Sequence, residues 1–288
     1  MNAFLAEYLA YRPRTALLEL TYNCNQTCPF CYCVWLTRPE LYHEELSIDE
    51  WKRVVELIAA NGARRLVFTG GEPLLKRGWS ELVAFARDLS SETTLSLITN
   101  GTLVDEQTLD VLKRYDVELH VTFSGVRRLD RLTGRDAKCF NAANVIKAAS
   151  ERGLRVGAGV PVSTLNVRDL RTILCAARLA GATSITVGSI LPEGRAEHNP
   201  TLVLNDRQFA TAKKKTAQVA AFYKNCSIGF TDERACSCSA KKNDYRFVRV
   251  GNCDAGRTFY TISPGGYFRQ CSFSKVDEFF WRELEETV

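Results

Sequence analysis

The chain has 288 residues, of which 45% are hydrophobic and 25% are charged, and its net charge is +5. These fractions are typical of globular proteins and exclude a disordered, collagen-like or coiled-coil chain. The sequence contains no apolar run long enough to span a bilayer, and its first residues do not form a signal peptide, so it predicts a cytoplasmic protein that does not contact membranes. No stretch interleaves aromatic with basic residues, which argues against nucleic acid as a partner.

Short apolar or β-branched segments alternate with longer amphipathic segments from about residue 15 to about residue 225. Strands are expected at 15–20, 65–69, 94–98, 117–123, 155–160 and 184–187. Helices are expected at 47–62, 79–89, 104–115, 141–153 and 167–181. The first of these helices opens with a capping box of Ser47 and Glu50 and ends at Gly62.

This alternation predicts right-handed βαβ units and a parallel sheet. Because six such units are too few to close an eight-stranded barrel, we expect an α/β fold, a partial (β/α)6 TIM-like barrel. Its active site should then lie at the C-terminal ends of the strands.

After about residue 225 the composition changes to one rich in Gly, Ser, Cys and Lys. The sequence FYTISPGGYFRQC predicts a hairpin that turns at 264–266. We therefore divide the chain into an N-terminal extension (1–14), a partial barrel (15–225) and a small cysteine-rich C-terminal unit (226–288). A unit of this size with few apolar residues is expected to need bound metal in order to fold.

Cysteine is the residue type that departs most from the average, with 11 copies in a chain expected to keep its thiols reduced. Cys24, Cys28 and Cys31 follow the first expected strand with the spacing C-x3-C-x2-C. Zinc normally takes four ligands, whereas three thiolates in one tight loop suit three corners of a cubane iron-sulfur cluster. The fourth iron would then have an open position, which is what a catalyst needs.

The cysteine spacing resembles that of the radical S-adenosylmethionine (radical SAM) enzymes. In that family the three thiolates hold a 4Fe-4S cluster whose open iron is chelated by the amino and carboxylate groups of S-adenosylmethionine. Phe30 matches the aromatic residue that usually precedes the third cysteine. The segment Gly70, Gly71, Glu72 and Pro73 matches the family's GGEP segment. There the glycines let the backbone approach the methionine moiety, and the glutamate faces its ammonium group.

Two further strand ends carry the same resemblance, which covers roughly residues 15 to 195. Asn100 in the sequence TNG and Ser124 in the sequence FSG are similar to family positions that contact the ribose and the carboxylate of S-adenosylmethionine. The resemblance implies that a donor such as flavodoxin or ferredoxin delivers an electron to the cluster. Reductive cleavage of S-adenosylmethionine then yields a 5'-deoxyadenosyl radical, which abstracts hydrogen from a substrate.

The C-terminal cysteines carry a second resemblance. Cys253 and Cys271 flank the expected hairpin in a way that is similar to the first half of the SPASM domain and of its shorter relative, the twitch domain. Those domains hold auxiliary iron-sulfur clusters in enzymes that modify peptides or small molecules, and the resemblance implies an auxiliary 4Fe-4S cluster here. No cysteine follows Cys271, so Cys236 and Cys238 are the nearest further ligands, with Cys226 in reserve.

The substrate class remains open at this point. The second resemblance favours a ribosomally made peptide that is crosslinked, epimerised or oxidised, and the alternative within the class is a small-molecule dehydrogenase or a cofactor-biosynthesis enzyme. An alternative of another kind is a zinc- or cluster-binding protein without activity, which would leave the GGEP segment without a purpose. Glu19, Glu118 and Asp254 are candidate acid-base groups, and the sequence selects none of them.

Overall fold

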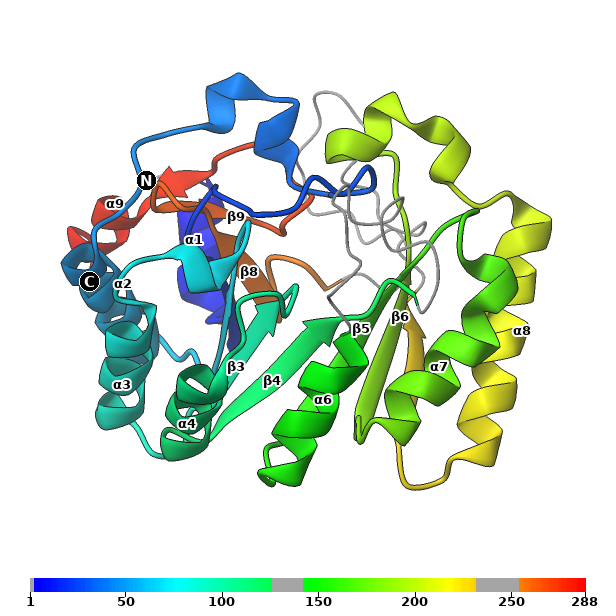
Figure 1. Ribbon diagram of the computed structural model, residues 1–288. Helices are drawn as coiled ribbons and strands as arrows, with labels where there is room; N and C mark the ends of the chain where they lie inside the picture. The colour runs from blue at the N-terminus through cyan, green and yellow to red at the C-terminus, as the bar shows by residue number, and fades with distance from the viewer. Residues whose placement is uncertain (1–2, 126–141, 232–253) are drawn as a thin grey trace. The chain divides into compact units, whose positions relative to one another are not determined.

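The computed structural model describes residues 3–125, 142–231 and 254–288. These residues form two compact units, in each of which helices accompany a sheet (Figure 1). The first unit contains the described residues of 1–24, 33–97 and 235–288, and the second contains those of 25–32 and 98–234. Among the described residues, no helix is long and apolar enough to cross a membrane.

The sheet of the first unit has the strand order β10-β9-β8-β1-β2-β3. Its strands are β1 (Thr15–Glu19), β2 (Arg65–Thr69), β3 (Thr94–Thr99), β8 (Phe259–Ile262), β9 (Tyr267–Arg269) and β10 (Phe279–Phe280). Strand β1 pairs in parallel with β2 on one side and with β8 on the other, and β2 pairs in parallel with β3. Strands β8 and β9 are antiparallel, which confirms the predicted hairpin.

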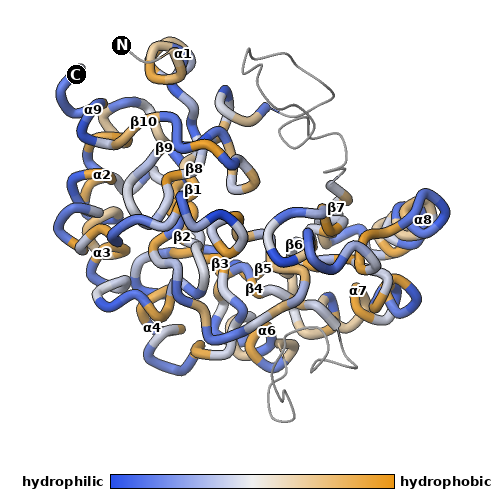
Figure 2. Tube along the Cα trace, turned by 90° about the horizontal axis from the view of Figure 1, so that it is seen from above, coloured by the Kyte–Doolittle hydropathy of each residue, from blue (hydrophilic) through white to orange (hydrophobic). Residues whose placement is uncertain are grey.

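Helices α1 (Ala3–Tyr11), α2 (Ile48–Ala60), α3 (Trp79–Leu89) and α9 (Trp281–Glu285) belong to this unit. The predicted capping box is confirmed, because the Ser47 hydroxyl accepts from the Glu50 N–H and the Glu50 carboxylate accepts from the Ser47 N–H at 2.9 Å. Each interaction satisfies a backbone or hydroxyl group at the start of the helix. Figure 2 shows hydrophobic and hydrophilic residues alternating along α2 and α3, and hydrophobic side chains such as Val54 and Val83 are buried.

The second unit contains the parallel strand order β4-β5-β6-β7. Its strands are β4 (Val117–Thr122), β5 (Val156–Val162), β6 (Ser184–Ser189) and β7 (Ser227–Thr231), and its helices are α4 (Glu106–Arg114), α6 (Ala142–Glu151), α7 (Leu170–Leu179) and α8 (Asp206–Phe222). The first three residues of β5 are buried, so this part of the strand is covered on both faces, as expected for a parallel sheet covered by helices. Helix α8 and strand β7 were not among the predicted elements.

The described C-terminal residues build a core together with α1. Tyr8 packs edge-on against Tyr260 and Phe268, with ring centroids 5.1 and 5.4 Å apart, and Phe268 stacks on Phe279 at 4.4 Å. These four side chains are at most 2% exposed. A few aromatic residues thus supply the apolar contacts that the composition of this region does not suggest. The domain boundary at residue 225 stays a prediction.

Glu278 lies beside this aromatic core, and burial raises its pKa to about 7. Burial is the largest cause of this pKa shift, a hydrogen bond from Gln270 at 3.3 Å opposes it, and the carboxylates of Asp277 and Glu7 contribute to it. Because the folded state then binds a proton that the unfolded state has released, the free energy of unfolding should fall as the pH rises from about 4.5 through 7. We expect a loss of ~1–2 kcal/mol between pH 5.5 and pH 8, after allowance for partial exposure of the side chain.

Urea unfolding of the wild type and of Glu278→Gln at both pH values measures this effect. The variant should lose most of the pH dependence. Glu285→Gln, which changes an exposed glutamate on α9, should keep the wild-type pH dependence. An unchanged pH dependence in Glu278→Gln would contradict the assignment.

Candidate functional site

The cysteine loop, residues 24–31, follows β1. Cys24 is exposed, Cys28 and Cys31 are half-buried, and all three are thiols rather than disulfides. A tight turn joins the last two, since the Cys31 N–H donates to the Cys28 carbonyl oxygen at 3.2 Å. Three thiols that solvent can reach within one short loop are the donor set that an iron-sulfur cluster takes. In the described part of the chain no three His, Cys, Asp or Glu side chains are grouped at metal-binding distance, so ligation by these cysteines stays a prediction.

Gly70 and Gly71 lie at the end of β2, against the backbone that leads into the cysteine loop. The Gly71 N–H donates to the Thr21 carbonyl oxygen at 2.8 Å, and a Cβ on Gly71 would lie 2.2 Å from the Asn23 carbonyl oxygen. Gly70 has a φ of +135° and also has little room, because its Cβ would lie 2.8 Å from the Thr21 carbonyl oxygen. Both positions therefore require glycine so that the end of β2 can pack against the backbone that follows β1. That backbone, residues 21–23, leads directly to Cys24. The predicted approach of the same glycines to S-adenosylmethionine is not tested by these contacts.

Glu72 and Pro73 follow directly. Pro73 opens the short 3-10 helix Pro73–Leu75, and the Glu72 carboxylate accepts from the Leu74 N–H at 3.2 Å. Glu72 is 0% exposed. One of its oxygens thus caps this helix, and its predicted contact with the ammonium group of the cofactor stays a prediction.

Asn100 contacts the cysteine loop through Asn25, which lies between Cys24 and Cys28 in the sequence. The Asn100 amide donates to Asn25 Oδ1 at 2.8 Å, and Asn100 Oδ1 accepts from the backbone N–H of Thr102 at 2.9 Å and from its hydroxyl at 2.6 Å. The Asn25 amide donates to the Thr102 hydroxyl at 2.7 Å. Asn100 therefore supports the loop in this structure, and its predicted contact with S-adenosylmethionine stays a prediction.

Ser124 and Phe30 complete the set of predicted cofactor-binding residues. Ser124 is buried just after β4, and its carbonyl oxygen accepts from the Asn166 amide at 2.8 Å. Phe30 is half-buried within the cysteine loop. The contacts of both residues with the cofactor stay predictions.

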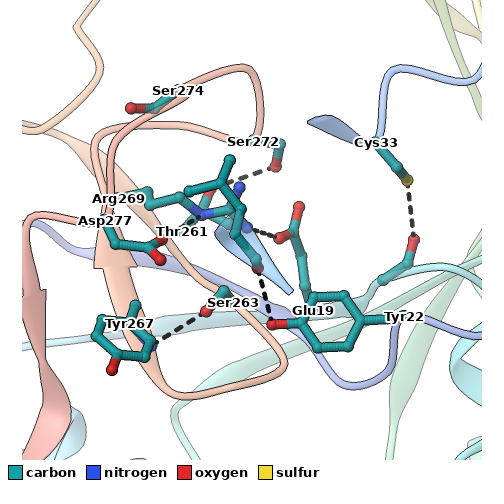
Figure 3. A network of polar contacts seen from close by, with 12 residues as sticks. Glu19, Tyr22, Cys33, Thr261, Ser263, Tyr267, Arg269, Ser272, Ser274 and Asp277 are labelled. Carbon is teal, nitrogen blue, oxygen red and sulfur yellow. Dashed lines mark hydrogen bonds and ion pairs between the residues drawn. The ribbon is translucent and has the colours of Figure 1, made fainter. Parts of the chain in front are cut away.

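A buried polar network that the sequence does not reveal joins β1 to the C-terminal hairpin (Figure 3). Glu19 forms an ion pair with Arg269, and these side chains are 0% and 1% exposed. Asp277 Oδ1 lies 3.7 Å from Arg269 Nε, and Asp277 Oδ2 lies 2.8 Å from His43 Nε2, within hydrogen-bond distance. Burial raises the pKa of Glu19, and the positive charge of Arg269 opposes that shift. A buried glutamate that is paired with an arginine stabilises the fold, and this weakens the case for Glu19 as a catalytic acid or base.

The predicted auxiliary ligands lie largely outside the described residues, since Cys236, Cys238 and Cys253 fall in 232–253. Cys271 is described, follows β9 and is 4% exposed. The ligand set of an auxiliary cluster therefore stays a prediction.

Comparison with known proteins decides the family. Residues 18–174, more than half of the chain, match the radical SAM superfamily. The chain belongs to the radical SAM superfamily. It is therefore an enzyme that uses a 4Fe-4S cluster and S-adenosylmethionine, as the sequence predicted.

Named relatives of this radical SAM enzyme include proteins that act on peptides. The PqqA peptide cyclase of Granulibacter bethesdensis is 29% identical over 269 residues, which cover 90% of this chain and 67% of the relative. The sporulation killing factor maturation protein SkfB of Bacillus subtilis is 30% identical over 189 residues, which cover 65% of this chain and 45% of the relative. The matched part of the radical SAM chain thus spans less than half of SkfB and about two thirds of the cyclase.

Solved structures confirm the fold of this radical SAM enzyme. Streptococcus suis SuiB bound to its precursor peptide SuiA has a TM-score of 0.69 at 14% identity, covering 94% of this chain and 63% of SuiB. The protein anSMEcpe, with bound AdoMet and Cp18Cys peptide, has a TM-score of 0.67 at 15% identity, covering 95% of this chain and 80% of anSMEcpe. The predicted α/β partial barrel is therefore confirmed.

Proposed function

We propose that this radical SAM enzyme matures a ribosomally made peptide by abstracting hydrogen from it, which leads to crosslinking, epimerisation or oxidation. The observation that carries the proposal is the extent of the match to peptide-acting relatives. The PqqA peptide cyclases of Granulibacter bethesdensis and Gluconobacter oxydans match 90% and 92% of this chain, so the likeness extends beyond the barrel into part of 226–288.

A second candidate is a small-molecule or cofactor-biosynthesis reaction. It is favoured by a relative named Fe-coproporphyrin III synthase, from Methanosarcina barkeri, which is 30% identical over 175 residues. That match covers only 60% of this chain. Because the peptide cyclases match a much larger share, the peptide substrate is the better supported of the two.

In this proposal the chain's own residues bind and orient the cofactor and the substrate. Cys24, Cys28 and Cys31 would hold the 4Fe-4S cluster, and the segment from Gly70 to Pro73 would lie beside S-adenosylmethionine. The bound cofactor supplies reductive cleavage and a 5'-deoxyadenosyl radical that abstracts hydrogen. The protein positions the target hydrogen and keeps water away, since the cofactor carries the difficult chemistry. Cys271, with Cys236, Cys238 and Cys253, would hold an auxiliary cluster.

The test is an anaerobic reaction with S-adenosylmethionine, a reductant such as flavodoxin or dithionite, and short peptides encoded beside the gene. The proposal expects 5'-deoxyadenosine to form together with a peptide that has lost two hydrogen atoms, or one that has taken up deuterium from heavy water. Cleavage of S-adenosylmethionine with no change in any such peptide, together with turnover of a small molecule encoded by the neighbouring pathway, would favour the second candidate.

A further inference from the structure

Within the second unit, the segment after β6 lies directly against the second half of the cysteine loop. This segment, residues 193–199, is called here the post-β6 segment, and it includes the 3-10 helix Gly194–His198. The Arg195 N–H donates to the Cys31 carbonyl oxygen at 2.9 Å. A Cβ on Gly194 would lie 2.4 Å from the same oxygen and 2.7 Å from the Tyr32 carbonyl carbon. Only glycine fits at this approach, and it also adopts a φ of +56°, which other residues rarely do.

A side chain of the same segment reaches the loop two residues earlier. The Asn199 amide donates to the Pro29 carbonyl oxygen at 3.4 Å and to the Arg195 carbonyl oxygen at 2.9 Å. The Asn199 amide thus forms one hydrogen bond to the cysteine loop and one within the post-β6 segment. The carbonyl groups on both sides of Phe30 are engaged, and this restricts the backbone dihedral angles that set the direction of the Cys31 side chain.

The first half of the loop has a separate support in the same unit, through the contacts of Asn25 with Asn100 and Thr102 described above. Each half is therefore held by hydrogen bonds to a different loop that follows a strand. All of these bonds form between protein groups, so the loop has a defined shape from the protein alone.

We propose that Gly194, Arg195 and Asn199 are positioning residues for Cys31, which fix the direction of its thiolate before and after the cluster binds. The inference rests on the proposed role of Cys31 as a cluster ligand. Partners behind a metal ligand orient it, and their loss typically weakens metal binding about 10- to 100-fold. The same residues should also influence how the cluster responds to S-adenosylmethionine, because a rotated thiolate changes the geometry around the iron atoms.

The test compares Gly194→Ala and Asn199→Ala in the full chain, reconstituted without oxygen. We expect each variant to release cluster iron to a chelator about 10-fold faster than the wild type. The reduced variants should also have an altered EPR signal and a smaller change on addition of S-adenosylmethionine. Neither readout requires a peptide substrate.

Gly153→Ala is the matched control, because Gly153 also has a positive φ (+71°) but its Cβ would meet only the flexible end of Lys113 at 3.3 Å. It carries the same backbone strain without touching the cysteine loop. Iron release and EPR signals equal to those of Gly153→Ala, in both variants, would overturn the proposal. If Gly194→Ala does not fold, Asn199→Ala decides alone, since it creates no steric clash.

Failure of the proposed function has a different signature. If the variant with Cys24, Cys28 and Cys31 all changed to alanine binds as much iron as the wild type, the loop holds no cluster. The positioning role then falls with the ligand assignment. If the positioning role alone is wrong, the triple variant loses iron while Gly194→Ala and Asn199→Ala do not.

Discussion

Replacement of Cys24, Cys28 and Cys31 together by alanine is expected to abolish cleavage of S-adenosylmethionine. Without the three thiolates the N-terminal cluster has no protein ligands, and no other group in the cysteine loop can supply soft donors of this kind. Formation of 5'-deoxyadenosine by the reduced variant should fall to the level seen without enzyme. If the C-terminal cysteines hold an auxiliary cluster, about half of the iron and sulfide should remain, as two separate cubane clusters require.

A control with the same number of altered thiols is available. Cys33, Cys139 and Cys175 lie outside the predicted ligand sets. Their joint replacement by alanine should preserve both the iron content and S-adenosylmethionine cleavage, at some cost in stability because Cys33 is buried. Retention of cleavage by the first triple variant would show that the cluster is held elsewhere. Complete loss of iron would show that the chain holds a single cluster.

Local signals in the sequence were enough to predict most of the barrel elements. Strand Arg65–Thr69 and helix Trp79–Leu89 have the predicted bounds, and the capping box at Ser47 fixes the start of α2. Such elements depend on short apolar runs and on side chains that satisfy the groups at a helix end, so the information lies within a few residues.

Elements with incomplete local signals were missed. Helix α8 has a capping box of Asn205 and Gln208, but three consecutive lysines from Lys213 to Lys215 blur its apolar face. Strand β7 alternates between exposed and half-buried residues, and its place is set by parallel pairing with β6. The pairing of β8 with β1 joins residues almost 250 positions apart, and no local pattern encodes it.

The candidate site shows the same division. The spacing of the cysteines and the GGEP segment identify the residue types, and their order at strand ends predicts the edge of the sheet on which they lie. The supports could not be predicted, because each depends on a contact made by folding. Gly71 faces the Asn23 carbonyl oxygen, and Gly194 faces that of Cys31, across 48 and 163 residues of sequence, as their numbers show.

Substitution of Arg269 by methionine is expected to cost about 3–5 kcal/mol of the free energy of unfolding, the largest effect on stability that we predict. Arg269 is 1% exposed and pairs with Glu19, which is 0% exposed, and it also lies 3.7 Å from Asp277. Methionine has a similar length but no charge, so Glu19 would remain buried without a cation. An unpaired buried carboxylate is costly, which is why loss of one partner destabilises more than replacement of the pair.

The pH dependence of the variant has a definite sign. Burial already raises the pKa of Glu19, and the loss of Arg269 removes the main opposing charge, so the pKa should rise further. The folded variant then favours protonated Glu19 and loses stability as the pH rises above the carboxyl pKa of the unfolded chain. Urea unfolding should therefore show a smaller difference from the wild type at pH 5 than at pH 8.

A double variant separates the charge effect from a packing effect. Glu19→Gln combined with Arg269→Met removes both charges of the pair, and it should recover at least half of the lost stability because no ionised carboxylate remains opposite the substituted residue. Arg152→Met, which breaks the more exposed pair with Glu106, should change the free energy of unfolding by less than about 1 kcal/mol. If the double variant is as unstable as Arg269→Met alone at every pH, the guanidinium acts through packing, including its position 5.8 Å from the Trp35 ring, and not through charge. A recovery confined to high pH would locate the cost in the ionised form of Glu19, and hence in the electrostatics that join β1 to the C-terminal hairpin.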